Sequence, residues 1–289
     1  MGYSTFTKLF ESCICPILDY SSGVWGYHKF EKINTIQNRA MRIFLGVHRF
    51  APKLALEGDM GWMLSRNRRF ICILRLWNRL LNLPDDRMTK QIFINDYYLA
   101  QSGHENWCSN VYKILLLLDQ ENIFYERQNI DINMVKKQLS DIHEKQWLLA
   151  ISNKPKLRTY KTFKETTNVE NYIKYNLTTS ERSLTAQLRF GILPLTIETG
   201  RFCKIKLEER LCTLCQCGEI EDEYHFLFNC SLYAQIRQTW INSIMTVHEN
   251  FNLLDNASKF KIIFSKFHRC TAKYILQCFN LRKDNLLSS

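Results

Sequence analysis

The sequence predicts a mainly α-helical protein. Its 289 residues include only ten Gly and five Pro, while Leu, Ile, Lys, Arg and Gln are frequent and alternating runs of Val and Thr are scarce. In several stretches apolar residues recur three or four positions apart, which is the period of a helix with one buried face. With 46% hydrophobic and 23% charged residues, the composition excludes a disordered or collagenous protein, and the length suits about two domains.

The first predicted helix covers about residues 30–47. Its apolar positions lie three, four and seven residues apart, so we expect them to form one buried face: Ile33, Ile36, Ala40, Ile43, Phe44 and Val47. Gly46 lies near the last turn and is expected to end this helix.

A second helix is predicted over residues 66–83, and Pro84 is expected to end it. Its apolar positions again follow the helical period. The residues expected to point inward are Phe70, Ile73, Leu74, Trp77, Leu80 and Leu81.

The opposite face of this second helix is basic. Arg68, Arg75 and Arg79 form a stripe along it, and Arg66 and Arg69 lie beside the stripe near the helix start. Many amphipathic helices carry a solvated charged face that contacts nothing. Because no Asp or Glu occurs between residues 66 and 83, the pattern favours a surface that binds phosphate groups.

Helical patterns recur in the middle of the chain, around residues 111–118 and 134–151. In the second stretch the expected inward residues are Val135, Leu139, Ile142, Gln146 and Leu149. A basic segment follows, in which five cations precede the next acid, Glu165: Lys154, Lys156, Arg158, Lys161 and Lys164. Such runs are either solvated linkers or contacts for nucleic acid, and Lys154, Lys156 and Arg158 are the candidate phosphate contacts.

The strongest chemical pattern is RLCTLCQCGEIEDEYHFLFNC, residues 210–230. Two residues separate Cys212 from Cys215, a spacing that lets one turn present two thiolates to a metal ion, and His225 and Cys230 complete a Cys3His set. Because four protein ligands leave no position for a catalytic water, we predict a structural Zn²⁺ site. For His225 and Cys230 to reach one ion, the helix that holds His225 should end near Asn229.

Two alternatives remain open for this pattern. Cys217, which precedes Gly218, can replace Cys215 after a small shift of register. The cysteines can also cluster in a helical segment that holds no metal.

The predicted zinc segment is itself acidic. Between residues 212 and 230 it contains four acids and no Lys or Arg: Glu219, Glu221, Asp222 and Glu223. Any contact of this region with nucleic acid is therefore expected from its basic flanks, which contain Arg189, Arg201, Lys204, Lys206 and Arg210.

The charge of the whole chain indicates a polyanionic partner. Thirty-nine Lys and Arg against 28 Asp and Glu give a net charge of +11, which suits nucleic acid or an anionic membrane surface. The first twenty residues contain Lys8, Glu11 and Asp19 rather than an apolar signal segment, so we expect an intracellular protein, nuclear or cytoplasmic, with reduced thiols. The longest aliphatic run, residues 114–118, is too short to span a bilayer, and no membrane partner is expected.

Patterns of independent catalysis are missing from the sequence. Asp85 and Asp86 look like a metal-binding carboxylate pair, but they follow Pro84 in a predicted turn instead of a strand. His143 and Glu144 begin a metalloprotease-like pattern that lacks its second His. Neither the GxSxG nor the GxxxxGK pattern occurs. We therefore expect no catalytic residues in this chain.

Several motifs occur together in a fixed order. Residues 17–83 contain YSSGVWG, KINTIQNRAMRIFLGV, GDMGW and RRFICILRLWNRLL, and residues 184–240 contain LTAQLRFGILPLTIETGRF, EERLCTLC and IEDEYHFLFNCSLYAQIR. The first part resembles the thumb region that follows the palm in reverse transcriptases of non-LTR retrotransposons of the LINE type, such as jockey- and CR1-like elements. The second is similar to the C-terminal zinc-binding segment of the same proteins, including its Cys-x2-Cys…His-x4-Cys order.

Together with the periodicity and charge patterns above, this resemblance predicts three regions: a thumb-like helical bundle over residues 1–84, a helical connector over 85–178 with its basic linker near 154–164, and a Cys3His zinc domain over 179–289. It implies a C-terminal part of a reverse transcriptase that binds RNA or DNA through phosphates and lacks the palm, with its catalytic aspartates, and the endonuclease. A separate palm is then a further partner. The alternatives are a helical protein-interaction module and a non-functional retroelement remnant.

Overall fold

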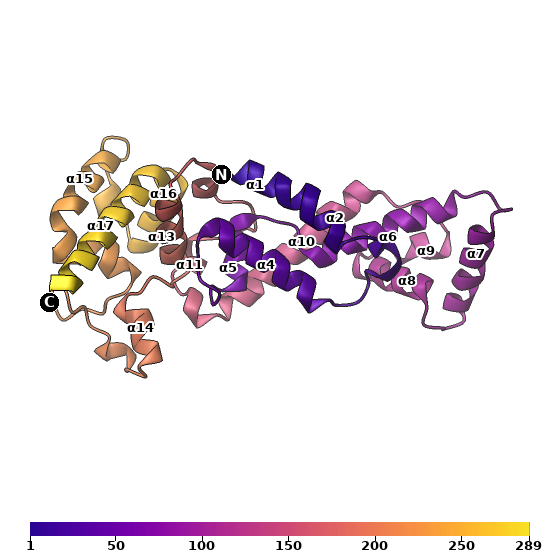
Figure 1. The fold of residues 1–289 in the computed structure, drawn as a ribbon, viewed down its shortest axis with the longest axis horizontal. Coiled ribbons are helices and arrows are strands. Elements are labelled where there is room, and N and C mark those ends of the chain that lie inside the picture. The colour runs from indigo at the N-terminus through magenta and orange to yellow at the C-terminus, as the bar shows by residue number, and fades with distance from the viewer. Residues whose placement is uncertain (289) are drawn as a thin grey trace. The chain divides into compact units, whose positions relative to one another are not determined.

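The computed structural model describes residues 1–288 and is mainly helical, which confirms the predicted fold class. Helices make up 69% of the chain, and the described part contains 17 α-helices and no β-strand. An isolated antiparallel bridge joins Leu211 and Ile220. Figure 1 shows the ribbon with most of its α-helices labelled. None of the described helices combines the length and the apolar character that crossing a bilayer requires.

The chain forms two compact units. Unit 1 contains residues 1–6, 38–61 and the described chain from 147 onward, and unit 2 contains residues 7–37 and 62–146. Three helices contribute residues to both units: α1 (Tyr3–Leu9), α4 (Glu31–Leu45) and α10 (Ile132–Ser152). The three regions expected from the sequence stay a prediction.

Unit 2 is built around the apolar face of α6 (Ser65–Leu81). Trp77 is fully buried, stacks on Phe124 at 5.5 Å and meets the edge of Phe93 at 5.3 Å. Phe70, Ile73 and Leu74 are buried beside it, as the helical period predicts. The other elements of the unit are η1 (Phe10–Ile14), α2 (Cys15–Leu18), α3 (Ser22–Trp25), α7 (Met88–Gln101), α8 (Trp107–Leu117) and α9 (Glu121–Tyr125).

Helix α6 ends before Pro84, as predicted. Lys90 donates hydrogen bonds from Nζ to the carbonyl oxygens of Leu80 and Leu81, at 3.2 and 2.6 Å. These bonds satisfy carbonyls that have no partner within the helix.

Unit 1 contains the remaining helices and a second aromatic core. In this core the rings of Trp240 and Tyr274 stack at 4.2 Å and are nearly parallel. The elements are α5 (Lys53–Met60), η2 (Pro155–Leu157), α11 (Tyr160–Phe163), α12 (Asn171–Lys174), α13 (Thr179–Arg189), α14 (Thr196–Phe202), η3 (Leu207–Glu209), η4 (His225–Asn229), η5 (Ser231–Tyr233), α15 (Ala234–Met245), η6 (Phe251–Leu253), α16 (Asn256–Ser265) and α17 (His268–Ser288).

Helix α5 is held in unit 1 by a close approach of the backbone. A Cβ atom at Gly58 would lie 2.4 Å from the ring of Trp147 and 2.5 Å from the hydroxyl of Tyr160, so only Gly fits there. The Trp147 indole donates to the carbonyl of Leu54 at 2.8 Å.

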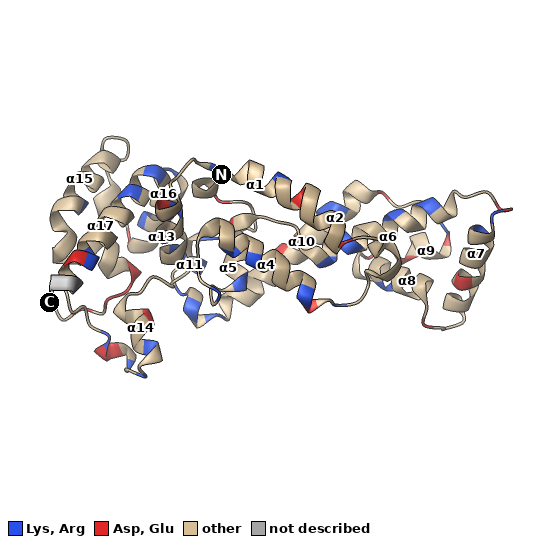
Figure 2. Cartoon of the chain, viewed as in Figure 1, with Lys and Arg blue, Asp and Glu red and all other residues tan. Residues whose placement is uncertain are grey.

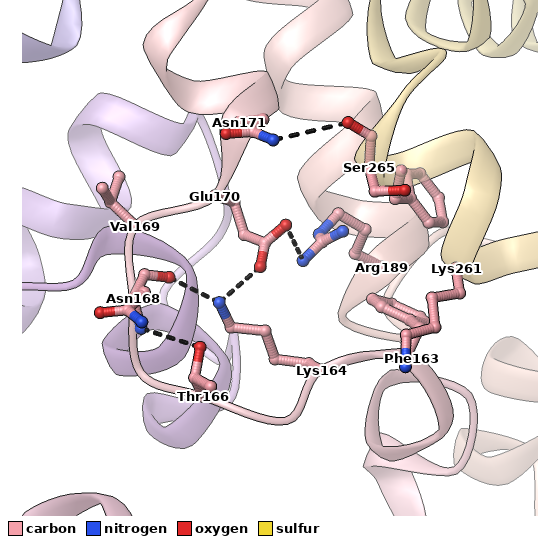
Figure 3. A pocket seen from close by; sticks show the side chains of 11 residues that line it. Phe163, Lys164, Thr166, Asn168, Val169, Glu170, Asn171, Arg189, Lys261 and Ser265 are labelled. Atoms are coloured by element: carbon pink, nitrogen blue, oxygen red, sulfur yellow. Dashed lines mark hydrogen bonds and ion pairs between the residues drawn. The ribbon is translucent and has the colours of Figure 1, made fainter. Parts of the chain in front are cut away.

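A buried polar network also holds unit 1 together. Asp59 accepts hydrogen bonds from Nε and Nη2 of Arg189 and from the hydroxyls of Tyr160 and Tyr172, all at 2.8 Å. Glu170 also contacts Arg189, at 3.1 Å, and pairs with Lys164. Figure 3 shows the Glu170 carboxylate between these two cations. The expectation that Arg189 contacts nucleic acid is therefore wrong, because its side chain is fully buried.

Two predicted helix faces differ from the structure. Ile36 and Ile43 of α4 are 43% and 65% exposed, and Leu149 of α10 is 69% exposed, although all three were expected to point inward. In α10 the burial follows every fourth residue near the helix end, at Trp147 and Ile151. Residues four apart are offset by about 40° around a helix. A buried stripe with this spacing therefore turns away from the face that alternating spacings of three and four residues would define.

The predicted end of the first helix is confirmed. Helix α4 ends at Leu45, and Gly46 takes the left-handed conformation with φ of 67°. Gly adopts this conformation at little cost, which makes it a common residue just after a helix.

Candidate metal centre

Four side chains meet in unit 1. The Sγ atoms of Cys212, Cys215 and Cys230 and a ring nitrogen of His225 all lie within 4.8 Å of one another. Cys212, His225 and Cys230 are buried, and Cys215 is half-buried. Sequence spacing predicts this set, and the fold brings its members together so that they can hold a metal ion.

A short loop presents the first two cysteines. The bridge between Leu211 and Ile220 closes it, and the amide of Cys212 donates to the carbonyl of Glu219 at 2.8 Å. Inside the loop Gln216 and Gly218 have φ of 54° and 70°, so the chain turns sharply after Cys215. The turn places both thiols on the same side of the loop, as a two-residue spacing requires.

A single turn of π-helix, η4, positions the other two candidate ligands: His225 is its first residue and Cys230 follows its last. Asp222 Oδ1 accepts from the amide of His225 at 2.8 Å, and the amide of Cys230 donates to the carbonyl of His225 at 2.8 Å. This i→i+5 bond adds a residue to the turn. The turn ends at Asn229, where the sequence requires it to end, and Cys230 then leaves with ψ of 124°.

Glu219 orients the imidazole of His225. Its Oε2 atom lies 2.8 Å from Nδ1 of His225, so Nδ1 carries the proton and Nε2 faces Cys215 Sγ at 3.3 Å. The hydrogen bonds from His225 and Asn229 lower the pKa of Glu219. A carboxylate on the far nitrogen of a histidine is the usual support of a metal ligand. Sequence reasoning named Glu219 only as part of an acidic segment.

The three thiols differ in their readiness to ionise. Burial is the largest effect on Cys215 and opposes ionisation, but hydrogen bonds from the Cys217 amide and from the Cys217, Cys212 and His225 side chains outweigh it and lower its pKa to about 6. Burial raises the pKa of Cys212 and of Cys230. A metal ion that binds here therefore has to displace protons from two buried thiols.

Cys217 does not join the cluster. It is exposed, and its Sγ atom donates to the carbonyl oxygen of Cys215 at 3.4 Å. The geometry thus favours Cys215 over the alternative register.

The donor set of the cluster consists of three thiol sulfurs and one imidazole nitrogen. Three sulfurs and one imidazole nitrogen suit tetrahedral Zn²⁺, and four protein ligands fill its coordination shell. The set contains no carboxylate or carbonyl oxygen, which Mg²⁺ and Ca²⁺ prefer.

The acids around the cluster anchor it inside unit 1. Glu221 is buried, pairs with Arg282 of α17 and accepts from the amide of Thr196 at 2.7 Å. Glu223 is also buried and accepts from Arg158 at 2.6 Å and from Thr159 at 3.0 Å. These acids therefore hold residues 212–230 against α14, α17 and the turn before α11.

The predicted basic linker is largely paired in the structure. Arg158 contacts Glu223, and Lys156 pairs with Glu198 at 2.6 Å. Lys154 is exposed and forms no ion pair within residues 1–288. Among residues 1–288, Lys154 is therefore the one candidate phosphate contact of this segment that has no acidic partner.

The five arginines of α6 do not form one exposed face. Arg69 is 1% exposed and donates to the carbonyl of Gly26 at 3.3 Å, so the expectation that it lies at the surface is wrong. Arg68 bonds to Asp19 at 2.9 Å and to Gln37 at 2.8 Å, with 20% of its side chain exposed.

Arg66, Arg75 and Arg79 are exposed and have no acidic partner within the described chain. Arg75 and Arg79 are four residues apart and share one side of α6. Arg66 precedes Arg75 by nine residues, or about two and a half turns, and lies on the other side. Figure 2 shows that Lys and Arg occur on α4 and α16 as well as on α6, so positive charge is spread over several helices.

The basic residues that flank residues 212–230 are only partly free to contact another molecule. Arg201 pairs with Glu198 at 2.9 Å, and Arg210 donates to the carbonyls of Ile205 and Ile197. Lys204 and Lys206 are exposed.

No protein-family model matches this chain, and no curated protein or solved structure matches it either.

Proposed function

We propose that this chain binds RNA or DNA through exposed cations of a helical scaffold, and that a structural Zn²⁺ ion stabilises that scaffold. The observation that carries the proposal is the convergence of Cys212, Cys215, His225 and Cys230 in a chain of net charge +11. Unit 1, which holds this cluster, has 24 Lys and Arg against 15 Asp and Glu, a net charge of +9. Phosphate contacts by such a surface bind nucleic acid without reading its sequence.

Arg75 and Arg79 are the proposed phosphate contacts of unit 2. Both are exposed, both lack an acidic partner among the described residues, and they project from the same side of α6. The role follows the resemblance to the thumb of non-LTR retrotransposon reverse transcriptases, in which this helix would lie against a primer–template duplex. In this proposal the chain corresponds to the C-terminal part of such an enzyme.

Fluorescence anisotropy with labelled single-stranded RNA and duplex DNA tests the proposal. Affinity should fall as salt rises, and the Arg75→Gln/Arg79→Gln variant should reduce the slope of log affinity against log salt by about 1.5. Arg66→Gln, a single charge on the other side of α6, is the control and should change the slope by less than half as much. Absence of binding, or a slope that the double variant leaves unchanged, would contradict the proposal.

A second candidate function is protein interaction. Phe202, Val247 and Leu253 are 77%, 75% and 85% exposed, and each is a candidate apolar contact for a partner protein. Light scattering separates the two proposals, because a self-associating chain that ignores RNA favours this second function.

A further inference from the structure

A cavity of about 530 Å³ lies in unit 1 where α16 ends and α17 begins. Its walls include Lys266, Arg269 and Lys273 and no Asp or Glu. All three cations are exposed, and none forms an ion pair with any residue that the structure describes. The cavity therefore concentrates positive charge that the protein leaves uncompensated.

The position of these cations is unfavourable for the helix itself. Arg269 and Lys273 are four residues apart on α17, where like charges repel each other. Lys266 and Arg269 also lie at the positive end of the helix dipole, where acids are normally preferred, and the first turn of α17 has no acid. A bound anion would relieve both kinds of repulsion.

An aromatic surface adjoins the charge. Tyr175 lines the same cavity with 51% of its surface exposed, and its ring lies 3.9 Å from that of His268. His268 is itself 7% exposed, so the Tyr175 ring rests on a buried side chain. The cavity therefore places a half-exposed aromatic ring beside its three cations.

The cavity in Figure 3 makes a useful contrast. Its cations, Lys164 and Arg189, face Glu170 directly, and Arg189 is also held by Asp59. Lys261 at its edge pairs with Glu165 at 2.7 Å. That cavity offers an anion no free positive charge, whereas the cavity at the start of α17 offers three.

We propose that the cavity at the start of α17 binds one nucleotide of a single-stranded nucleic acid. Lys266, Arg269 and Lys273 hold its phosphate, and the base stacks on the exposed face of Tyr175. Aromatic side chains beside a basic groove bind single strands in this way, because every base has a face that can stack. The macromolecular source of the nucleotide rests on the proposed function, but the cavity itself can be tested without it.

Calorimetric titration of the full chain with adenosine monophosphate, ribose phosphate and inorganic phosphate tests the cavity. Adenosine monophosphate should bind roughly tenfold more tightly than ribose phosphate, because only the former stacks. Tyr175→Ala should abolish this difference, and Tyr175→Phe should keep it. Arg269→Gln/Lys273→Gln should weaken all three probes.

Lys283→Gln is the matched control, since Lys283 is exposed on the same helix but does not line the cavity. All these positions lie at the surface, and circular dichroism checks that each variant keeps its helix content. Equal binding of adenosine monophosphate by the wild type and Arg269→Gln/Lys273→Gln, or no binding, overturns the proposal.

A labelled single-stranded RNA distinguishes failure of the cavity from failure of the proposed function. If Arg75→Gln/Arg79→Gln weakens RNA binding and Arg269→Gln/Lys273→Gln does not, the cavity proposal fails and the proposed function stands. If adenosine monophosphate binds in the cavity but the chain binds no RNA, the proposed function fails and the cavity remains a nucleotide site.

Discussion

Arg189 and Asp59 are joined by two hydrogen bonds of 2.8 Å although 130 residues separate them in the chain, and both side chains are fully buried. The hydroxyls of Tyr160 and Tyr172 complete the bonding of the carboxylate. Burial, followed by the charge of Asp59, raises the pKa of both tyrosines well above its usual value, so both remain donors.

Removing one partner of this pair should destabilise the fold strongly. Asp59→Asn and Arg189→Met should each lower the free energy of unfolding by about 3–5 kcal/mol, because each breaks a buried charge pair. Asp59→Asn should lose the smaller amount, since Arg189 keeps the Glu170 carboxylate at 3.1 Å, whereas Arg189→Met leaves Asp59 without a cation. Urea unfolding followed by circular dichroism measures the loss. The Asp59→Asn/Arg189→Met double variant should lose less than the sum of the single losses, and strict additivity would show that the two residues do not act as a pair.

Part of this structure could be predicted from local sequence. The apolar period of α6 gives its buried face at Phe70, Ile73, Leu74 and Trp77, because periodicity depends only on neighbours within the helix. The pair of Asp59 and Arg189 could not be found this way, since each looks like an ordinary surface charge until the fold brings them together.

The metal cluster could be predicted from local sequence, whereas the burial of individual basic residues could not. The spacing of Cys212, Cys215, His225 and Cys230 is a local property, and the fold places all four together. The π-turn that aligns His225 with Cys230 has no simple sequence pattern. Arg69, by contrast, has the same charge as its exposed neighbours in α6, and only tertiary packing buries it.

The metal register can be decided with two cysteine variants. The wild type should contain about one zinc ion per chain, Cys215→Ser should lose it, and Cys217→Ser should keep it, because Cys217 lies at the surface outside the cluster. Mass spectrometry of the metal content and circular dichroism of the same samples measure both effects. Metal loss in Cys217→Ser with retention in Cys215→Ser would reverse the register.

Glu219 should tune the affinity of the metal site without being a ligand. Glu219→Gln removes the negative acceptor of the His225 Nδ1 proton and should weaken zinc binding by about 10- to 100-fold. Competition with a chromophoric chelator measures this change. Glu208→Gln, which removes an exposed acid of η3, should leave the affinity unchanged, and an equal effect of both variants would show that general charge is responsible.

Glu57 should make the stability of unit 1 depend on pH. Burial raises its pKa to about 7, and Lys53 only partly opposes this effect. Because the folded state holds the proton more tightly than the unfolded state, stability is lost as pH rises from the ordinary value of about 4.5 through about 7. Above that range Glu57 is ionised in the folded wild type, and its half-buried carboxylate lowers the free energy of unfolding. A neutral amide at this position has no such effect.

Glu57→Gln should therefore raise the free energy of unfolding by roughly 1–3 kcal/mol at about pH 8 and change it little at about pH 4.5. Urea unfolding of both proteins at the two pH values gives the difference directly, and ionisation of the cysteines cancels because both proteins contain them. Glu249→Gln, at an exposed position, should show the same difference from the wild type at both pH values. A stability gain of Glu57→Gln that is the same at both pH values would contradict the raised pKa of Glu57. It would mean that Glu57 is already ionised in the folded protein near pH 5, because the wild type loses stability across this range only if the folded protein keeps this proton until about pH 7.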